Sequence, residues 1–68
     1  MKAEDRKELF RKMACTVAPE KHKRAMVVAQ LLDIKPQTVR VYMSKKSGKA
    51  PSMVLIELFR MKIKNRQS

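Results

Sequence analysis

Apolar residues recur along the chain at spacings of three and four, as in amphipathic α-helices, and seldom alternate as in half-buried β-strands. This periodicity predicts helices over residues 3–15, 20–32, 36–44 and 52–63. No turn dipeptide of the Asn-Gly type separates alternating runs, so a β-sheet is not expected. The prediction is an all-α fold, a compact four- to five-helix domain in which residues 1–68 form a single unit.

The apolar faces of the first three predicted helices indicate the core. Their positions are Leu9, Phe10, Met13, Ala14, Ala25, Val28, Ala29, Leu32, Val39, Tyr42 and Met43. Cys15 is expected to pack as a small apolar residue. Residues 44–50 read as a polar, basic loop, and residues 64–68 as a frayed tail.

Residues 25–44, AMVVAQLLDIKPQTVRVYMS, place two short helical patterns on either side of a very short joint. Such a joint makes the two helices cross steeply, and the small Ala29 allows them to approach closely. Asp33 suits the end of the first helix because Asp tolerates the left-handed conformation better than most residues. Pro36 suits the first position of the next helix, where its missing N–H would be unpaired in any case.

This stretch resembles the helix-turn-helix of phage and bacterial transcription regulators, the Cro- and repressor-like group. That family has apolar residues at the fourth, eighth, tenth, fifteenth and eighteenth places of its motif and a small residue at the fifth. Here those places hold Val28, Leu32, Ile34, Val39 and Tyr42, and the small residue is Ala29. The basic loop and the following APSMVLIELFRM are similar to the small repressors encoded beside anti-CRISPR genes in phages.

Two positions depart from the family pattern. The ninth residue is usually glycine, but here it is Asp33, so strain is expected in the turn. The residue that caps the second helix is usually Ser or Thr, but here it is Lys35. Lysine cannot accept hydrogen bonds from the first N–H groups of a helix, so its side chain is free to reach a phosphate.

The resemblance implies a sequence-specific, double-stranded DNA-binding repressor whose helix near residues 36–44 enters the major groove. The side chains expected to reach base edges are Gln37, Thr38, Arg40 and Val41. Gln37 suits adenine, Arg40 guanine, and Val41 a thymine methyl group. The alternative for each of these residues is a solvated helix face, and Arg40 has the further alternative of contacting a phosphate instead of a base.

The charge balance supports a polyanionic partner. Seventeen Lys and Arg oppose six Asp and Glu, so the formal net charge is +11. The residues expected to contact phosphates flank the motif and are Lys21, His22, Lys23, Lys35, Ser44, Lys45, Lys46 and Lys49.

The last predicted helix has apolar residues around more than one face, which predicts a homodimer through residues 52–63. Leu55, Leu58 and Phe59 are expected to face the core. The candidate interface residues are Met53, Ile56, Phe59 and Ile63, so Phe59 stands in both groups. Such a dimer would place two reading helices about one DNA turn apart, ~34 Å, on an inverted repeat.

The residues favour no enzyme, metal or cofactor and no small-molecule substrate, since one His and one Cys form no catalytic or metal-binding pattern. The charged start and the short apolar runs predict neither a signal peptide nor a membrane span, so a cytoplasmic protein is expected. The resemblance adds that it acts at the nucleoid of a bacterial host and represses its own phage operon. The alternatives are sequence-neutral nucleic-acid or architectural binding, and inhibition of an acidic protein.

Overall fold

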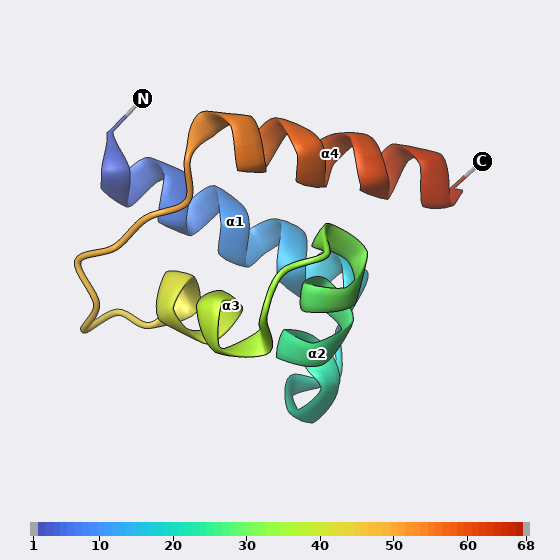
Figure 1. Ribbon diagram of the computed structural model, residues 1–68, viewed down its shortest axis with the longest axis horizontal. Helices are drawn as coiled ribbons and strands as arrows, with labels where there is room; N and C mark the ends of the chain where they lie inside the picture. The colour runs from blue at the N-terminus through green and yellow to red at the C-terminus, as the bar shows by residue number, and fades with distance from the viewer. Residues whose placement is uncertain (1, 68) are drawn as a thin grey trace.

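Four helices account for most of the chain. The computed structural model describes residues 2–67, and of Gln67 only the backbone. The helices are α1 (Ala3–Val17), α2 (Lys21–Leu32), α3 (Pro36–Met43) and α4 (Met53–Gln67), and no strand occurs among the described residues (Figure 1). The predicted all-helical fold is therefore confirmed, with a compact form of 33 × 26 × 18 Å.

The helix α1 runs through the middle of the molecule. It packs against each of the other three helices, with α3 and α4 on different sides of it (Figure 1). Phe10 joins these sides, because its ring meets Tyr42 of α3 edge-on at 5.7 Å between centroids and Phe59 of α4 at 5.2 Å. Within the described chain, α3 and α4 have no close backbone approach to each other, so this aromatic cluster links them through α1.

The core follows the apolar pattern of the first three helices. Its buried cluster consists of Phe10, Ala14, Val28, Ala29, Leu32, Val39 and Phe59. The predicted core positions Met13, Ala25, Tyr42 and Met43 pack against it and are partly buried. Cys15 is exposed, and its predicted place in the core is wrong.

The turn between α2 and α3 has a left-handed residue. Asp33 has φ 57° and ψ 45°, which confirms its predicted role at the end of the preceding helix. The Ile34 N–H donates to the carbonyl of Ala29 at 2.9 Å, and the Asp33 N–H donates to that of Gln30 at 3.4 Å. This pair of bonds satisfies carbonyls at the end of α2 and fixes the direction in which α3 leaves.

The last helix begins at a cap and extends beyond its predicted end. The Ser52 hydroxyl accepts a hydrogen bond from the Leu55 N–H at 3.2 Å, as an N-cap residue does. The helix continues to Gln67, so the predicted fraying of residues 64–68 is wrong for residues 64–67, and Ser68 lies outside the described residues. Lys64 and Arg66 lie in the last turn, where the helix dipole favours positive charge.

The inner and outer faces of α4 differ from the prediction. Ile56 and Phe59 are fully buried within one chain, and Ile63 packs against the core, so these three candidate interface residues are not free for a partner. Met53 is 42% exposed, and Leu58, which was expected to face the core, is 36% exposed. The reason is that α4 packs against both α1 and α2, and this contact turns Ile56 inward and Leu58 outward.

Candidate nucleic-acid interface

The helix α3 presents two long polar side chains to solvent. Its inner face is fixed because Val39 is fully buried and Tyr42 packs on Phe10. Gln37 and Arg40 are exposed on the outer face, whereas Thr38 and Val41 are half-buried. Of the four predicted base-reading residues, Gln37 and Arg40 therefore have the freer side chains, and a role in base reading stays a prediction for all four.

The start of α3 has no side-chain cap. Lys35 occupies the N-cap position with φ −76° and ψ 142°, and its side chain makes no capping hydrogen bond. Its carbonyl accepts from the Thr38 N–H at 3.0 Å and from the Val39 N–H at 3.3 Å. The first turn of α3 thus keeps the positive end of its dipole uncapped, beside a lysine with an exposed side chain.

A pocket of about 380 Å³ lies where α1, the start of α2 and α3 meet. We call it the basic pocket, and its lining residues are Arg11, Cys15, Lys21, His22, Arg24, Ala25, Arg40, Met43 and Ser44. Four of them are Lys or Arg, and no carboxylate lines the pocket. Cations gathered without a counter-charge attract an anion, because the field in a concave site is focused by its low-dielectric walls.

Arg24 connects two parts of the chain at this pocket through hydrogen bonds. Its Nε donates to the carbonyl of Ala18 at 2.9 Å, and a terminal nitrogen donates to that of Pro19 at 3.0 Å. These bonds tie α2 to the end of α1, because both carbonyls belong to the segment that joins the two helices. Arg24 therefore holds the walls of the basic pocket together.

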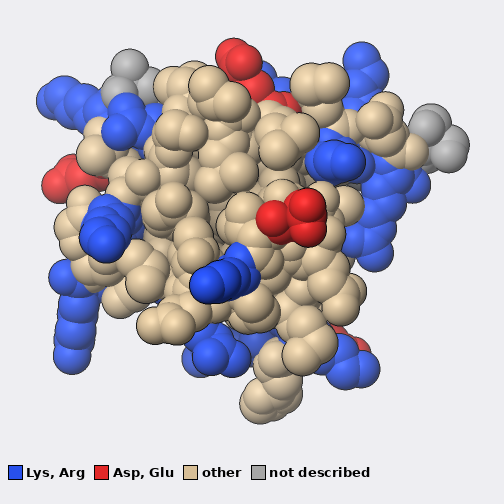
Figure 2. Space-filling model, viewed as in Figure 1, with Lys and Arg blue, Asp and Glu red and all other residues tan. Residues whose placement is uncertain are grey.

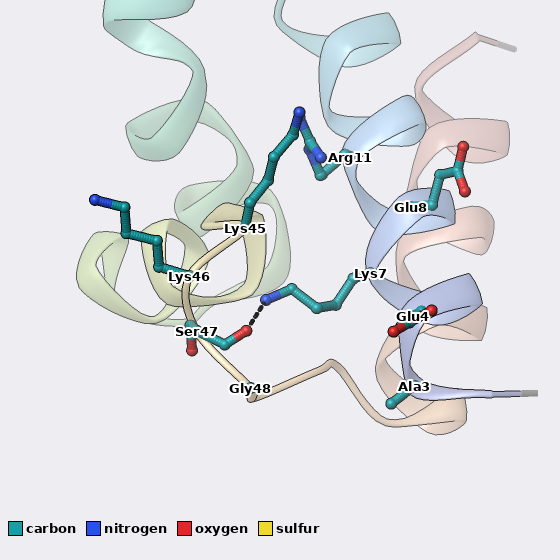
Figure 3. A pocket seen from close by; sticks show the side chains of 9 residues that line it. All are labelled: Ala3, Glu4, Lys7, Glu8, Arg11, Lys45, Lys46, Ser47 and Gly48. Atoms are coloured by element: carbon teal, nitrogen blue, oxygen red, sulfur yellow. Dashed lines mark hydrogen bonds between the residues drawn. The ribbon is translucent and has the colours of Figure 1, made fainter.

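A second hollow of about 660 Å³ lies between α1 and the loop of residues 44–50, and we call it the loop pocket (Figure 3). It is lined by Ala3, Glu4, Lys7, Glu8, Arg11, Lys45, Lys46, Ser47 and Gly48. Lys45 extends toward Arg11, whereas Lys46 points away from α1. Lys45 and Arg11 thus place two positive charges at the loop pocket, and Arg11 lines the basic pocket as well.

Lys7 holds this basic loop against α1. Its ammonium group donates to the carbonyls of Ser44 and Ser47, and the second bond is drawn in Figure 3. Within the loop, the Ser44 hydroxyl accepts from the Lys46 N–H at 3.3 Å, and the Ser47 hydroxyl accepts from the Lys49 N–H at 3.2 Å. These hydrogen bonds therefore define the backbone from which the lysines of the loop extend.

The structure brings most of the predicted phosphate-contacting residues to these two pockets. Lys21, His22 and Ser44 line the basic pocket, and Lys45 and Lys46 line the loop pocket. Lys35 and Lys49 are exposed but line neither. Lys23 forms an exposed ion pair with Glu20 at 3.7 Å and also lies outside both pockets.

Three cations at these pockets were missed by sequence reasoning: Lys7, Arg11 and Arg24. Lys7 and Arg11 lie four residues apart on the first helix and so share one face of it, which is a signal that the sequence contains. Nothing in the sequence tells which part of the chain that face meets. Only the packing of α1 against α3 brings the two residues to the motif.

The charge is distributed widely over the molecule. In Figure 2, basic side chains surround the face shown, and acidic ones are few. The sequence between Asp33 and Glu57, which contains α3 and the loop, has no acidic residue at all. The part of the chain without acidic residues therefore contains both α3 and the loop with Lys45 and Lys46.

Other kinds of site find no support in the part of the chain that is described. No group of three His, Cys, Asp or Glu side chains is placed to hold a metal ion there. None of the helices in residues 2–67 has the length and apolar character needed to cross a membrane. Comparisons with protein-family models, with curated proteins and with solved structures find no match to this chain.

Proposed function

We propose that the protein is a sequence-specific transcriptional repressor that binds double-stranded DNA, with α2 and α3 as a helix-turn-helix and α3 in the major groove. The observation that carries this proposal is the exposed pair Gln37 and Arg40 on a helix whose opposite face is buried. A reading helix needs both properties, because base contacts discriminate only when the side chains start from a fixed backbone.

The surroundings of α3 support contact with the DNA backbone. The basic pocket lies at one side of α3, and the loop with Lys45 and Lys46 follows its end. Phosphate contacts from both sides would set the register and orientation of the helix, while base contacts select the sequence. We assign Lys21, Lys45 and Lys46 to the phosphates, and Arg11 as a further contact from α1.

The repressor activity and its setting rest on the resemblance of residues 25–44 to phage regulators. We propose that the protein acts in the bacterial cytoplasm as a dimer on an inverted repeat and represses its own phage operon. It would act by occupying promoter DNA and excluding the transcription machinery.

Selection of bound duplexes from a random DNA pool, repeated at two salt concentrations, tests this function. We expect enrichment of an inverted repeat at both concentrations, because base contacts add to the salt-dependent attraction of phosphates. Enrichment of no sequence, together with binding that vanishes as salt rises, would contradict sequence-specific recognition.

A second candidate is sequence-neutral binding of nucleic acid, and the spread of basic side chains around the face shown in Figure 2 favours it. Against it, Phe10 and Phe59 are fully buried, and Tyr42 packs on Phe10, so the aromatic rings of the described chain do not form an exposed platform for stacking bases. Binding of duplex DNA compared with RNA of equal length distinguishes the candidates. Equal affinity would favour the neutral binder.

A further inference from the structure

The outer face of α4 has an apolar stripe that nothing in the described chain covers. Val54, Leu58 and Met61 are 77%, 36% and 61% exposed, and their spacing of four and then three residues places them on one face of the helix. We call these three residues the outer stripe. The opposite face of α4, with Ile56 and Phe59, is packed into the core.

One edge of the outer stripe has opposite charges. Glu57 and Lys64 lie seven residues apart, or about two turns, and so on the same edge. Glu57 is the sole acidic residue of α4, and both side chains are exposed. Neither forms a salt bridge within the part of the chain that is described. The edge therefore has one free charge of each sign, two turns apart.

We infer that a second copy of this chain covers the outer stripe, with the two α4 helices antiparallel across a two-fold axis. In an antiparallel pair, an edge of one helix lies beside the same edge of the partner helix. The residues of the two edges run in opposite directions, so an early residue of one faces a late residue of the other. An axis between Arg60 and Met61 then places Glu57 opposite Lys64 of the partner subunit, and symmetry makes this pair twice. The charges of the edge thus complement themselves.

The same axis also fits the apolar residues. Leu58 and Met61 lie on either side of it, so they alternate with the partner's Met61 and the partner's Leu58 along the seam. In a parallel pair this edge of one helix would instead lie against the other edge of the partner, so Glu57 and the partner's Lys64 would not meet. The sequence of the edge therefore selects the antiparallel arrangement.

The outer stripe is small compared with the ~800 Å² that each partner of a stable complex buries. A formal charge of +11 on each chain further opposes association. The dimer is therefore weak in free solution, and DNA, which neutralises this charge, strengthens it.

This dimer also sets the separation of the two DNA half-sites, an inference that rests on the proposed function. Because α3 and α4 lie on different sides of α1, two subunits joined by α4 hold their α3 helices well apart (Figure 1). With roughly 8–10 Å between neighbouring helix axes, the five spacings along a line of six helices give an upper limit of about 50 Å. The half-sites would then be separated by between one turn, ~34 Å, and about one and a half turns of DNA.

Sedimentation equilibrium of the full chain without DNA, up to about millimolar protein, tests the pairing. We expect a concentration-dependent dimer, and we expect Glu57→Lys and Lys64→Glu each to raise its dissociation constant about tenfold. The double variant E57K/K64E restores the swapped pairs and should return the constant to within about threefold of the original. Circular dichroism checks that each variant stays helical.

A second set of variants tests the outer stripe itself. V54D/M61D should abolish the dimer, whereas Met26→Asp, on a side chain of α2 that is 59% exposed, should leave it unchanged. A chain that stays monomeric at all concentrations would overturn the inference, as would a charge swap that does not restore pairing or an equal effect of the Met26 variant. These measurements contain no DNA, so their failure leaves the proposed DNA binding to its own test.

Discussion

Asp33 has a backbone conformation that most residues avoid. It is the one described residue with a positive φ, at 57°, and it lies in the turn that sets the angle between α2 and α3. Left-handed backbone costs most residues roughly 1–2 kcal/mol, and Asp somewhat less because its short side chain bonds locally. Glycine adopts this conformation freely, which explains why a glycine is usual at this place in the resembling motif.

Replacement of Asp33 tests this strain. We expect Asp33→Gly to raise the free energy of unfolding by about 0.5–1 kcal/mol, because relief of strain exceeds the added flexibility of the unfolded chain. Asp33→Val should lower it by about 1–2 kcal/mol, since a β-branched residue tolerates positive φ poorly. Urea unfolding measures both. Equal stability of the two variants would show that the turn is not strained.

Gln37 provides a prediction on specificity. If it reads a base, Gln37→Ala should reduce the preference for the selected site by about 1–3 kcal/mol and leave affinity for random duplex unchanged. Competition binding with both duplexes measures the difference. Thr16→Ala, on the exposed surface of α1, is a matched control that should change neither affinity. A uniform loss on both duplexes would assign Gln37 to the backbone instead.

At the scale of elements, the periodicity of the sequence predicts all four helices because each has an apolar face of helical spacing. The ends of two helices extend further than predicted. In α1, Thr16 donates its hydroxyl hydrogen to the Lys12 carbonyl at 2.9 Å, and the helix continues to Val17. In α4, the basic residues that resemble a tail are also good helix formers, and they suit the end of a helix.

The faces of α4 were harder to predict because apolar residues occur on several of its sides. Periodicity alone cannot decide whether Ile56 or Leu58 points inward when both fit an apolar stripe. That choice depends on where α1 and α2 lie, so it is made by tertiary contacts. The same reason explains which residues of the site could be predicted. The outward residues of α3 follow from the apolar pattern of that helix, but Lys7 and Arg11 lie near the site only because α1 packs against α3.

Lys7 is expected to order the basic loop through its two hydrogen bonds to loop carbonyls. Lys7→Met removes two hydrogen bonds to loop carbonyls, so we expect a loss of about 1 kcal/mol in stability. Hydrogen exchange at the amides of Lys46 and Lys49 should become faster, because their bonds to Ser44 and Ser47 depend on the loop conformation.

Lys12→Met is the control for this variant. Lys12 lies on the same helix, and its one ion pair among residues 2–67, with Glu8 at 3.9 Å, is exposed and contributes little. The Lys12→Met variant removes the same charge but no hydrogen bond to the loop, so hydrogen exchange at the loop amides should not change. Equally faster hydrogen exchange in both variants would show that the positive charge, and not the hydrogen bonds of Lys7, orders the loop.

At the scale of the whole molecule, the charge of +11 makes any nucleic-acid affinity depend on salt. If Lys45 and Lys46 each contact a phosphate, the double variant K45A/K46A should reduce the slope of log affinity against log salt by about two. It should weaken binding to selected and random duplex alike. Titrations at several salt concentrations give the slope, and an unchanged slope would place both lysines away from the DNA.

We propose that a rigid helix with an exposed reading face selects a DNA sequence. The most direct test is the ratio of affinities for one selected inverted repeat and for a scrambled duplex of equal length, at a single moderate salt concentration. We expect a ratio of about a thousand or more, as specific DNA-binding proteins show. A ratio below about tenfold, or about 1.4 kcal/mol, would contradict sequence-specific recognition, because a single base contact could account for it.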